Sequence, residues 1–301
     1  MKNTKKAAAF LLAAAMTLSL AACGQSGSAS SAAPSSAAPA SSEAASSAAA
    51  SSETAGSSAA ASSAASTVST IKSGTLTMST NAEFEPFEYK DGTKIVGIDV
   101  DIANKVAQKL GDQLKINDVA FDSLIMELQT GKCDFVAAGM TVTDDRKKNV
   151  DFSDPYFDAT QSIIVPKGSA IKSRKDLNGK KVGVQQGTTG DSFCTNEDGK
   201  SDIKVGSVKR FNKGADAIQD LLNGRVEAVV IDDFPASKFV SKNSDKLVKL
   251  SDALTVEHYA IAVKKGDTAK LDVINGVLKD MKSSGELTKI INNYKSSLEG
   301  D

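Results

Sequence analysis

Strand and helix signals alternate along residues 71–301, and this alternation most constrains what the chain can fold into. Short apolar segments with the character of strands are separated by segments with apolar residues at helical spacing. The expected strands are 75–79, 116–120, 134–138, 181–185, 228–231 and 258–263, and the expected helices are 99–110, 122–130, 215–222, 268–283 and 285–295. Because the order strand–helix–strand occurs twice, we expect an α/β protein with two mainly parallel sheets.

The two α/β units are joined by two links with the character of strands, near Gln161–Pro166 and Glu257–Val263. Two extended crossings favour a hinge between two lobes. We expect lobe 1 to comprise residues 71–163 and 260–301, and lobe 2 to comprise residues 164–259. Ligands of open α/β sheets bind beyond the carboxyl ends of the strands, so the cleft between the lobes is the expected binding site.

Local signals place the ends of the first two helices. Asp99 and Asp122 precede apolar residues at helical spacing, and a carboxylate is a common helix N-cap. Gly111 and Gly131 follow the last apolar residues, where glycine commonly ends a helix. We therefore expect both aspartates to cap their helices.

The first 22 residues have the features of a signal peptide. Lys2, Lys5 and Lys6 precede an apolar run, Ala7–Leu20, which is too short for a comfortable membrane span. Small residues then precede Cys23, as in a bacterial lipobox, so we expect Cys23 to be lipidated and to become the mature N-terminus. The alternative is an ordinary signal peptide with an incidental cysteine.

Residues 23–70 are expected to form a flexible tether. After Cys23 this segment is almost entirely serine and alanine and lacks large apolar side chains, so it cannot repay its ordering entropy.

The formal net charge of the whole chain is −1, and it becomes −4 when the three N-terminal lysines are removed. A balanced charge does not indicate a nucleic-acid-binding surface.

The remaining cysteines and the single histidine exclude several kinds of site. Cys133, Cys194 and His258 do not have the spacing of metal ligands, so we expect no metal site and no cofactor. A disulfide between the two cysteines would lock the proposed hinge. We therefore expect both to be free thiols.

The segment Ala138–Lys148 carries the clearest signal for ligand binding. It is an apolar strand end followed by a polar turn with two threonines and Arg146. Backbone carbonyls, a hydroxyl and a guanidinium at one strand end are able to hold both charged groups of a small zwitterion. This pattern predicts a receptor for a small molecule.

Several motifs, in this order, resemble the polar amino-acid-binding proteins of ABC importers, family 3 of the extracellular solute-binding proteins. They are Asn81–Tyr89 (NAEFEPFEY), Gly97–Asp101 (GIDVD), Phe121–Asp122, Gly139–Lys148 (GMTVTDDRKK), Asp151–Tyr156 (DFSDPY), Gly187–Gly190 (GTTG) and Val230–Asp233 (VIDD). The resemblance covers about residues 71–298. It implies a two-lobed, periplasmic-binding-protein-like (Venus flytrap) α/β fold with two strand-like hinge crossings.

The resemblance also implies roles for individual residues. The residues implied for the ligand α-carboxylate are Arg146, Thr188, Thr189 and Thr141. Those implied for the α-ammonium are Gly139, Thr141 and Asp232. The ligand side chain is expected to meet Asn81, Glu83, Phe84, Phe121, Met140 and Gln185.

Each role has a structural alternative. Arg146 with Lys147 and Lys148 is also typical of a solvated helix face, and the 187–190 motif is also typical of a tight strand-to-helix turn. Asp232 has the alternative of a helix N-cap, although Asp233 fits that role better. The two phenylalanines have the alternative of core packing.

The ligand side chain is the least determined part of the prediction. Family members for glutamine often have an acid at the place of Asn81 and a lysine at the place of Gln185, and both are amides here. Glu83 either favours a cationic ligand, such as arginine or lysine, or faces water.

The resemblance implies an extracytoplasmic binding component of an ABC importer, which captures a polar amino acid by closure of its lobes. Its expected partners are the free amino acid, the permease and ATPase complex, and the membrane through lipid on Cys23. We expect a monomer with no nucleic acid partner and no enzymatic activity. The tether and the lipobox favour a Gram-positive cell surface, and the alternative is a periplasmic lipoprotein. The alternatives are a dehydratase-like enzyme with the same fold and a ligand-sensing module for a separate receptor.

Overall fold

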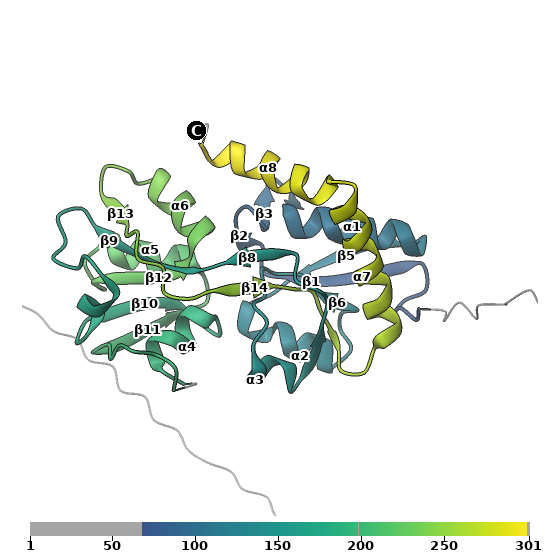
Figure 1. Ribbon diagram of the computed structural model, residues 1–301, viewed down its shortest axis with the longest axis horizontal. Coiled ribbons are helices and arrows are strands. Elements are labelled where there is room, and N and C mark those ends of the chain that lie inside the picture. Colours follow the sequence, from purple (N-terminus) through teal and green to yellow (C-terminus); the bar gives the residue numbers. More distant parts are fainter. Residues whose placement is uncertain (1–67, 198, 300–301) are drawn as a thin grey trace, which may run out of the picture. The chain divides into compact units, whose positions relative to one another are not determined.

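The computed structural model describes residues 68–197 and 199–299 (Figure 1). The predicted signal peptide, Cys23 and all but the last residues of the predicted tether lie outside these residues, so those predictions stay untested. Within the described part of the chain, no helix is long and apolar enough to cross a membrane.

The first of two five-stranded sheets has the order β5-β1-β6-β15-β7. Strand β1 (Thr75–Thr80) pairs in parallel with β5 (Gln113–Asp118) and β6 (Phe135–Val136). Strand β15 (Ala262–Lys264) is antiparallel to β6 and to β7 (Val150–Phe152). The predicted parallel core of this sheet is confirmed.

The second sheet has the order β11-β10-β12-β9-β13. Strand β10 (Lys181–Gln185) pairs in parallel with β11 (Ser207–Phe211) and β12 (Ala228–Asp232). Strand β9 (Gln161–Pro166) is antiparallel to β12 and to β13 (Leu247–Lys249). The segments that were expected to cross between the lobes therefore also contribute strands to the sheets, β9 to the second and β15 to the first.

The crossings themselves lie just before those strands. Strand β8 (Phe157–Ala159) pairs antiparallel with β14 (Glu257–Tyr259), and the two run side by side between the sheets (Figure 1). Two paired strands are a stiffer link than two separate loops. The expected pair of strand-like crossings is present, a few residues earlier in the chain than predicted on the β8 side.

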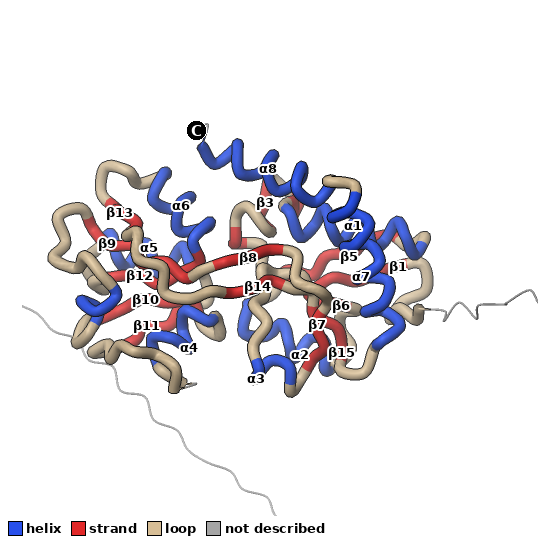
Figure 2. Tube along the Cα trace, viewed as in Figure 1, coloured by secondary structure: helices blue, strands red, loops and turns tan. Residues whose placement is uncertain are grey.

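Helices lie on both sides of each sheet (Figure 2). Around the first sheet they are α1 (Ile98–Leu110), α2 (Leu124–Gln129), the short α3 (Asp144–Lys147), α7 (Thr268–Ser283) and α8 (Glu286–Glu299). Around the second they are α4 (Thr189–Thr195), α5 (Gly214–Leu222) and α6 (Asp233–Ser241). Short 3-10 helices cover Phe121–Ser123 and Arg174–Leu177, and a small sheet is formed by β2 (Glu83–Phe84), β3 (Glu88–Asp91) and β4 (Lys94–Val96).

Strand β12 shows why the second sheet is covered on both faces. All its residues are buried, as is typical of a parallel strand between two helical layers. Val230 packs in a cluster with Cys194 of α4, while Val229 packs in another cluster with Ile218 and Leu221 of α5. Alternate residues of a strand point to opposite faces, so α4 and α5 cover opposite faces of the sheet.

The predicted N-caps of the first two helices are wrong. Gly97 occupies the N-cap position of α1 with φ 136°, and a Cβ there would lie 2.1 Å from the Phe87 carbonyl oxygen. Asp99 lies inside the helix, fully buried. Asp122 lies in the 3-10 helix before α2 and accepts a hydrogen bond of 2.8 Å from Gln186. Gly111 ends α1 in the left-handed conformation, as predicted.

Cys133 and Cys194 are buried free thiols in different hydrophobic clusters. Burial raises the pKa of Cys133 to about 11 and that of Cys194 to about 12, so both remain protonated.

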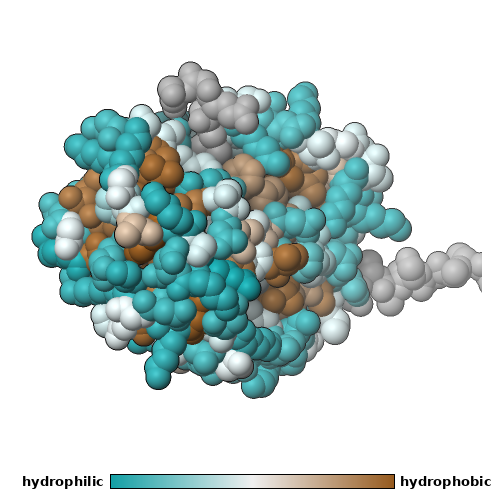
Figure 3. Space-filling model, turned by 60° about the vertical axis from the view of Figure 1, so that its left-hand side comes forward, coloured by the Kyte–Doolittle hydropathy of each residue, from teal (hydrophilic) through white to brown (hydrophobic). Residues whose placement is uncertain are grey.

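The face in Figure 3 is mainly hydrophilic with smaller hydrophobic areas between the polar side chains. Among the described residues, no cluster of three or more potential metal ligands was found.

Candidate functional site

The carboxyl ends of β1, β6, β10 and β12 converge on one cavity with residues from both lobes. Its lining contains all the predicted ligand contacts except Glu83 and Met140, together with Glu88, which was not predicted. The lining residues are Asn81, Phe84, Glu88, Phe121, Gly139, Thr141, Arg146, Gln185, Thr188, Thr189 and Asp232. The cavity volume is about 10 Å³, which is near the space that one water molecule needs. A bound amino acid therefore requires the lobes to part or the lining side chains to move.

The turn after β6 is held in place by Asp99. Gly139 has φ 51°, and a Cβ there would lie 2.7 Å from the Phe84 ring. Its N–H donates to the Asp99 carboxylate over 2.8 Å, and the Tyr156 hydroxyl donates to the same carboxylate over 2.6 Å. Burial raises the pKa of Asp99 to about 6, although these two hydrogen bonds oppose the shift. Asp99, predicted as a cap, thus positions the turn that carries the candidate site.

Arg146 reaches from α3 across the cleft. Its Nη1 donates to the Thr141 carbonyl oxygen over 2.7 Å, and its Nη2 donates to the Gly187 carbonyl oxygen in lobe 2 over 3.0 Å. The guanidinium lies 5.4 Å from the centre of the Phe121 ring, a cation–π contact. Burial lowers the pKa of Arg146, while the negative charges of Glu257 and Asp232 oppose this shift, and an arginine stays protonated.

The start of α4 brings Thr188 and Thr189 to the cavity. Thr188 is the N-cap, since its hydroxyl accepts from the Asp191 N–H over 3.2 Å and donates to the Gln185 carbonyl oxygen over 2.8 Å. The first N–H groups of a helix have no partner within the helix. Those N–H groups and the Arg146 guanidinium are therefore the hydrogen-bond donors suited to a carboxylate.

Asp232 provides the negative charge on the lobe 2 side. It stands at the N-cap position of α6 without a side-chain cap, and the Tyr259 hydroxyl donates to its carboxylate. Burial and the nearby negative charge of Glu257 raise the pKa of Asp232 to about 7. Asp233, the predicted cap, instead accepts hydrogen bonds from Ser162 and Lys249, because its carboxylate lies over β9 and β13. That cap prediction is wrong.

Two predicted specificity residues bond to each other across the cleft. Gln185 Nε2 donates to the Asn81 side-chain oxygen over 2.9 Å and to the Asn212 carbonyl oxygen over 3.1 Å. Asn81 Nδ2 in turn donates to the Val119 carbonyl oxygen over 2.8 Å. The two amides thus form one wall of the cavity.

Two other predicted specificity residues lie elsewhere. Glu83 forms an ion pair of 2.6 Å with Lys213 of lobe 2 and does not line the cavity. Met140 is buried in a cluster with Leu124 and Leu128. Their predicted contact with the ligand side chain has no support in this arrangement.

The sequence patterns missed Glu88. It is fully buried in the cavity wall, and among the described residues neither of its carboxyl oxygens has a hydrogen-bond partner other than the neighbouring Asp99 carboxyl group. Burial, with a further contribution from the charge of Asp99, raises its pKa well above the ordinary value. A lone acidic residue between two aromatics, Phe87 and Tyr89, gives no spacing signal that would have identified it.

Glu257 and Tyr259 were also missed, because their site partners are far away in the sequence. Glu257 accepts hydrogen bonds from Thr141, 116 residues away, and from Thr189, 68 residues away. Tyr259 packs edge-on against Phe87 with ring centres 5.1 Å apart. Both belong to β14, so one crossing strand bonds to residues that line the cavity, although neither Glu257 nor Tyr259 lines it.

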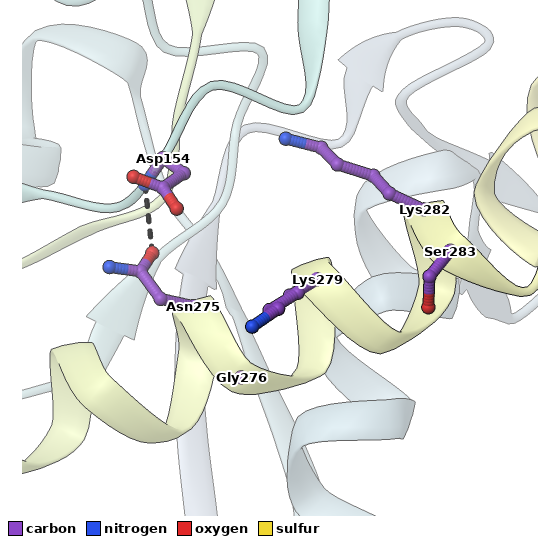
Figure 4. A pocket seen from close by; sticks show the side chains of 6 residues that line it. All are labelled: Asp154, Asn275, Gly276, Lys279, Lys282 and Ser283. Atoms are coloured by element: carbon purple, nitrogen blue, oxygen red, sulfur yellow. Dashed lines mark hydrogen bonds between the residues drawn. The ribbon is translucent and has the colours of Figure 1, made fainter.

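A second, open groove lies on α7, away from this site (Figure 4). It is lined by Asp154, Asn275, Gly276, Lys279, Lys282 and Ser283. Asn275 accepts a hydrogen bond of 2.8 Å from the Asp154 N–H, and Lys282 donates to the Pro155 carbonyl oxygen over 2.6 Å. These bonds attach α7 to the segment between β7 and β8, so we interpret the groove as part of a structural contact.

Comparison with known proteins gives a consistent result. Residues 76–297 match the family described as bacterial extracellular solute-binding proteins, family 3. A probable histidine-binding protein of Neisseria gonorrhoeae is 40% identical over 72% of this chain and 81% of its own length. The arginine-binding extracellular protein ArtP of Bacillus subtilis (strain 168) is 38% identical over 71% and 84%. The arginine-bound form of truncated ArgBP from T. maritima is 48% identical over 69% and 96%, with a TM-score of 0.64.

Proposed function

The chain belongs to family 3 of the bacterial extracellular solute-binding proteins, and we propose that it captures a cationic amino acid, with arginine as the first candidate. The amino acid would be delivered to the permease and ATPase complex of an ABC importer. Relatives that are named as histidine- and arginine-binding proteins support this class of ligand.

One observation carries the proposal: the Arg146 guanidinium and the Asp232 carboxylate line the same cavity. Every free amino acid has a carboxylate and an ammonium group on one carbon. A guanidinium is the best bidentate partner of a carboxylate, and a buried carboxylate favours a cation. Arg146, with the backbone N–H groups of Thr188 and Thr189, would hold the carboxylate, while Asp232, Gly139 and Thr141 would hold the ammonium.

Glu88 supports a cationic ligand side chain. A buried carboxyl group whose neighbour is another carboxyl group, Asp99, is costly, and an incoming guanidinium would supply both charge and donors. The Asn81–Gln185 pair would offer the ligand side chain amide groups from both lobes. The sequence suggested Glu83 as the acidic residue that favours a cationic ligand, and we propose Glu88 for this role instead.

We propose that capture uses closure of the two lobes, 71–160 with 260–301 and 161–259, since β9 pairs with β12 of the second sheet. Arg146 and Gln185 already bond across the cleft, to Gly187 and Asn81 respectively. A ligand held from both lobes binds the closed state more tightly than the open one and so shifts the population toward it. The paired strands β8 and β14 would act as the hinge.

We further propose that the protein is attached to the outer face of the cell membrane through lipid on Cys23, that it acts as a monomer, and that it catalyses no reaction. The spacing of Cys23 from the apolar run supports the anchor. Mass spectrometry of the mature protein from its host tests it. A mature N-terminus other than a lipid-modified Cys23 would exclude the anchor.

A thermal-shift screen of the purified protein against the twenty amino acids tests the ligand proposal. A ligand stabilises the folded state by mass action, by about 2.7 kcal/mol at a concentration 100 times Kd. We expect arginine to give the largest shift. Arg146→Ala should abolish the shift, whereas Lys148→Ala, at an exposed neighbour that pairs with Asp145, should retain it. If no amino acid stabilises the protein, the proposal fails.

A further inference from the structure

The Glu257 carboxylate is a buried acceptor shared by threonines from three segments. Its Oε2 accepts from the Thr141 hydroxyl over 2.7 Å and from the Thr189 hydroxyl over 2.9 Å. Its Oε1 accepts from the Thr255 hydroxyl over 2.8 Å. Only 5% of the Glu257 surface is exposed, so these hydrogen bonds replace those that water would give.

The direction of these bonds follows from the chemistry of the groups. A carboxylate has only acceptor positions, so each hydroxyl must donate to it. A threonine hydroxyl has one proton, and Thr141 and Thr189 have both committed theirs to Glu257. What remains on each Oγ1 is lone pairs, and one lone pair of Thr189 already accepts from Gln161 Nε2 over 3.1 Å.

Thr141 and Thr189 stand between the candidate site and Glu257, which lines a neighbouring pocket but not the cavity itself. Thr141 and Thr189 line the cavity together with Asp232. Because their protons point to Glu257, the hydroxyls can only accept hydrogen bonds from a ligand. A ligand group beside them must therefore be a donor, and an ammonium group carries three donors and a complementary charge.

We propose that Glu257 is a positioning residue that makes the site selective for a free α-ammonium group. It acts by orienting the Thr141 and Thr189 hydroxyls, and so disfavours ligands in which the ammonium is absent or is replaced by an acceptor, such as an α-keto acid. This inference rests on the proposed function. It also assigns Thr141, which the family resemblance implied for both charged groups of the ligand, to the ammonium alone.

The test compares L-arginine with 5-guanidinopentanoic acid, which keeps the carboxylate and the guanidinium but lacks the amine. Calorimetric titration of the wild-type protein should show a strong preference for arginine. Glu257→Gln replaces one oxygen by an N–H₂ donor. With the amide nitrogen at the Oε2 position, Thr141 and Thr189 both lose their acceptor, so both hydroxyl protons are released toward the cavity. We expect the Kd for arginine to rise about tenfold or more, which is the range for the loss of one hydrogen bond to a charged group. The Kd for the analogue should change by less than about twofold.

A double variant separates hydroxyl orientation from simple charge attraction. Thr141→Val removes the hydroxyl at nearly the same size, and on its own it should lower the affinity for arginine but not for the analogue. If Glu257 acts through the hydroxyls, adding Glu257→Gln to Thr141→Val should weaken arginine binding much less than it does in the wild type. An equal effect in both backgrounds would mean that Glu257 acts by charge alone, and the proposal would be wrong.

The remaining outcomes are also decisive. Equal weakening of arginine and the analogue in Glu257→Gln indicates a purely structural role and overturns the inference, while the proposed function stands. Absence of amino-acid binding by the wild type removes both. If Glu257→Gln does not fold, Thr141→Val alone decides, because an affinity ratio of arginine to the analogue that is unchanged from the wild type contradicts the proposal.

Discussion

Asp232 makes amino-acid binding depend on pH. Burial and the charge of Glu257 raise its pKa to about 7 from an ordinary value near 4. Below pH 7 the carboxyl group is protonated and hydrogen-bonded by Tyr259. Because a ligand ammonium prefers the ionised form, a proton must leave before the ammonium binds, and protons compete with the ligand.

The magnitude follows from this pKa. At pH 8 nearly all of Asp232 is ionised, whereas at pH 6 about one tenth is. The Kd for arginine should therefore rise about tenfold between pH 8 and pH 6, which corresponds to about 1.4 kcal/mol. Neither the α-carboxylate nor the α-ammonium of the ligand titrates in this range.

Folding stability should show the opposite pH dependence. A carboxyl group whose pKa is raised in the folded protein stabilises the fold at pH values below the pKa that the group has in the unfolded chain. This contribution to the free energy of unfolding is lost as the pH rises through the pKa of the folded state. For Asp232 that window runs from about pH 4 to about pH 7, and its full size is on the order of 4 kcal/mol. The ligand-free wild type should thus lose stability relative to Asp232→Asn as pH rises from 5 to 8.

Isothermal titration calorimetry at pH 8, 7 and 6 measures this effect. Repeating the titration at pH 6 in buffers of different ionisation enthalpy should reveal release of nearly one proton per arginine bound. Asp232→Asn should bind more weakly and lose the pH dependence between 8 and 6. Asp99, with a pKa of about 6, contributes only at the acidic end. A Kd that is constant from pH 8 to pH 6, or the same slope in Asp232→Asn, would refute the reasoning.

Three further predictions follow from the same geometry. Glu88→Gln should weaken arginine binding by about tenfold to a hundredfold, measured by calorimetry, with little change for a neutral amino acid if one binds. Gly139→Ala should lower the free energy of unfolding by about 1–3 kcal/mol in urea titrations, because φ is 51° and the added Cβ meets the Phe84 ring; wild-type stability in this variant would contradict the turn geometry. Cys133 and Cys194 should resist a thiol reagent in the native protein and react after unfolding, since burial keeps both thiols protonated; rapid native labelling of either would contradict their placement.

The sequence predicted those parts of the fold that depend on local pattern. Strands such as β10 and β12 and helices such as α5 and α7 have apolar residues at the right period and clear end signals, and the structure has them within a residue or two of the predicted bounds. Asp99 was assigned wrongly for a physical reason. It has the local signal of a cap, but the core uses its carboxylate to hold Gly139, which lies 40 residues away.

The candidate site also contains residues that local sequence patterns identify and residues that only the folded chain reveals. Arg146 and Asp232 stand at strand ends or in motifs that resemble a family, and the structure brings both to the cavity. Glu257 shows no signal in its own neighbourhood, because its role depends on threonines that only the folded chain brings to it. Such residues are invisible to periodicity and spacing.

A crystal structure of the protein grown with L-arginine tests the central claim most directly. We predict one arginine between the lobes, with its carboxylate in a bidentate contact with Arg146, its ammonium within hydrogen-bond distance of Asp232 and Thr141, and its guanidinium beside Glu88. An arginine held elsewhere on the protein, or held in the cavity without contact to Arg146 and Asp232, would contradict the account.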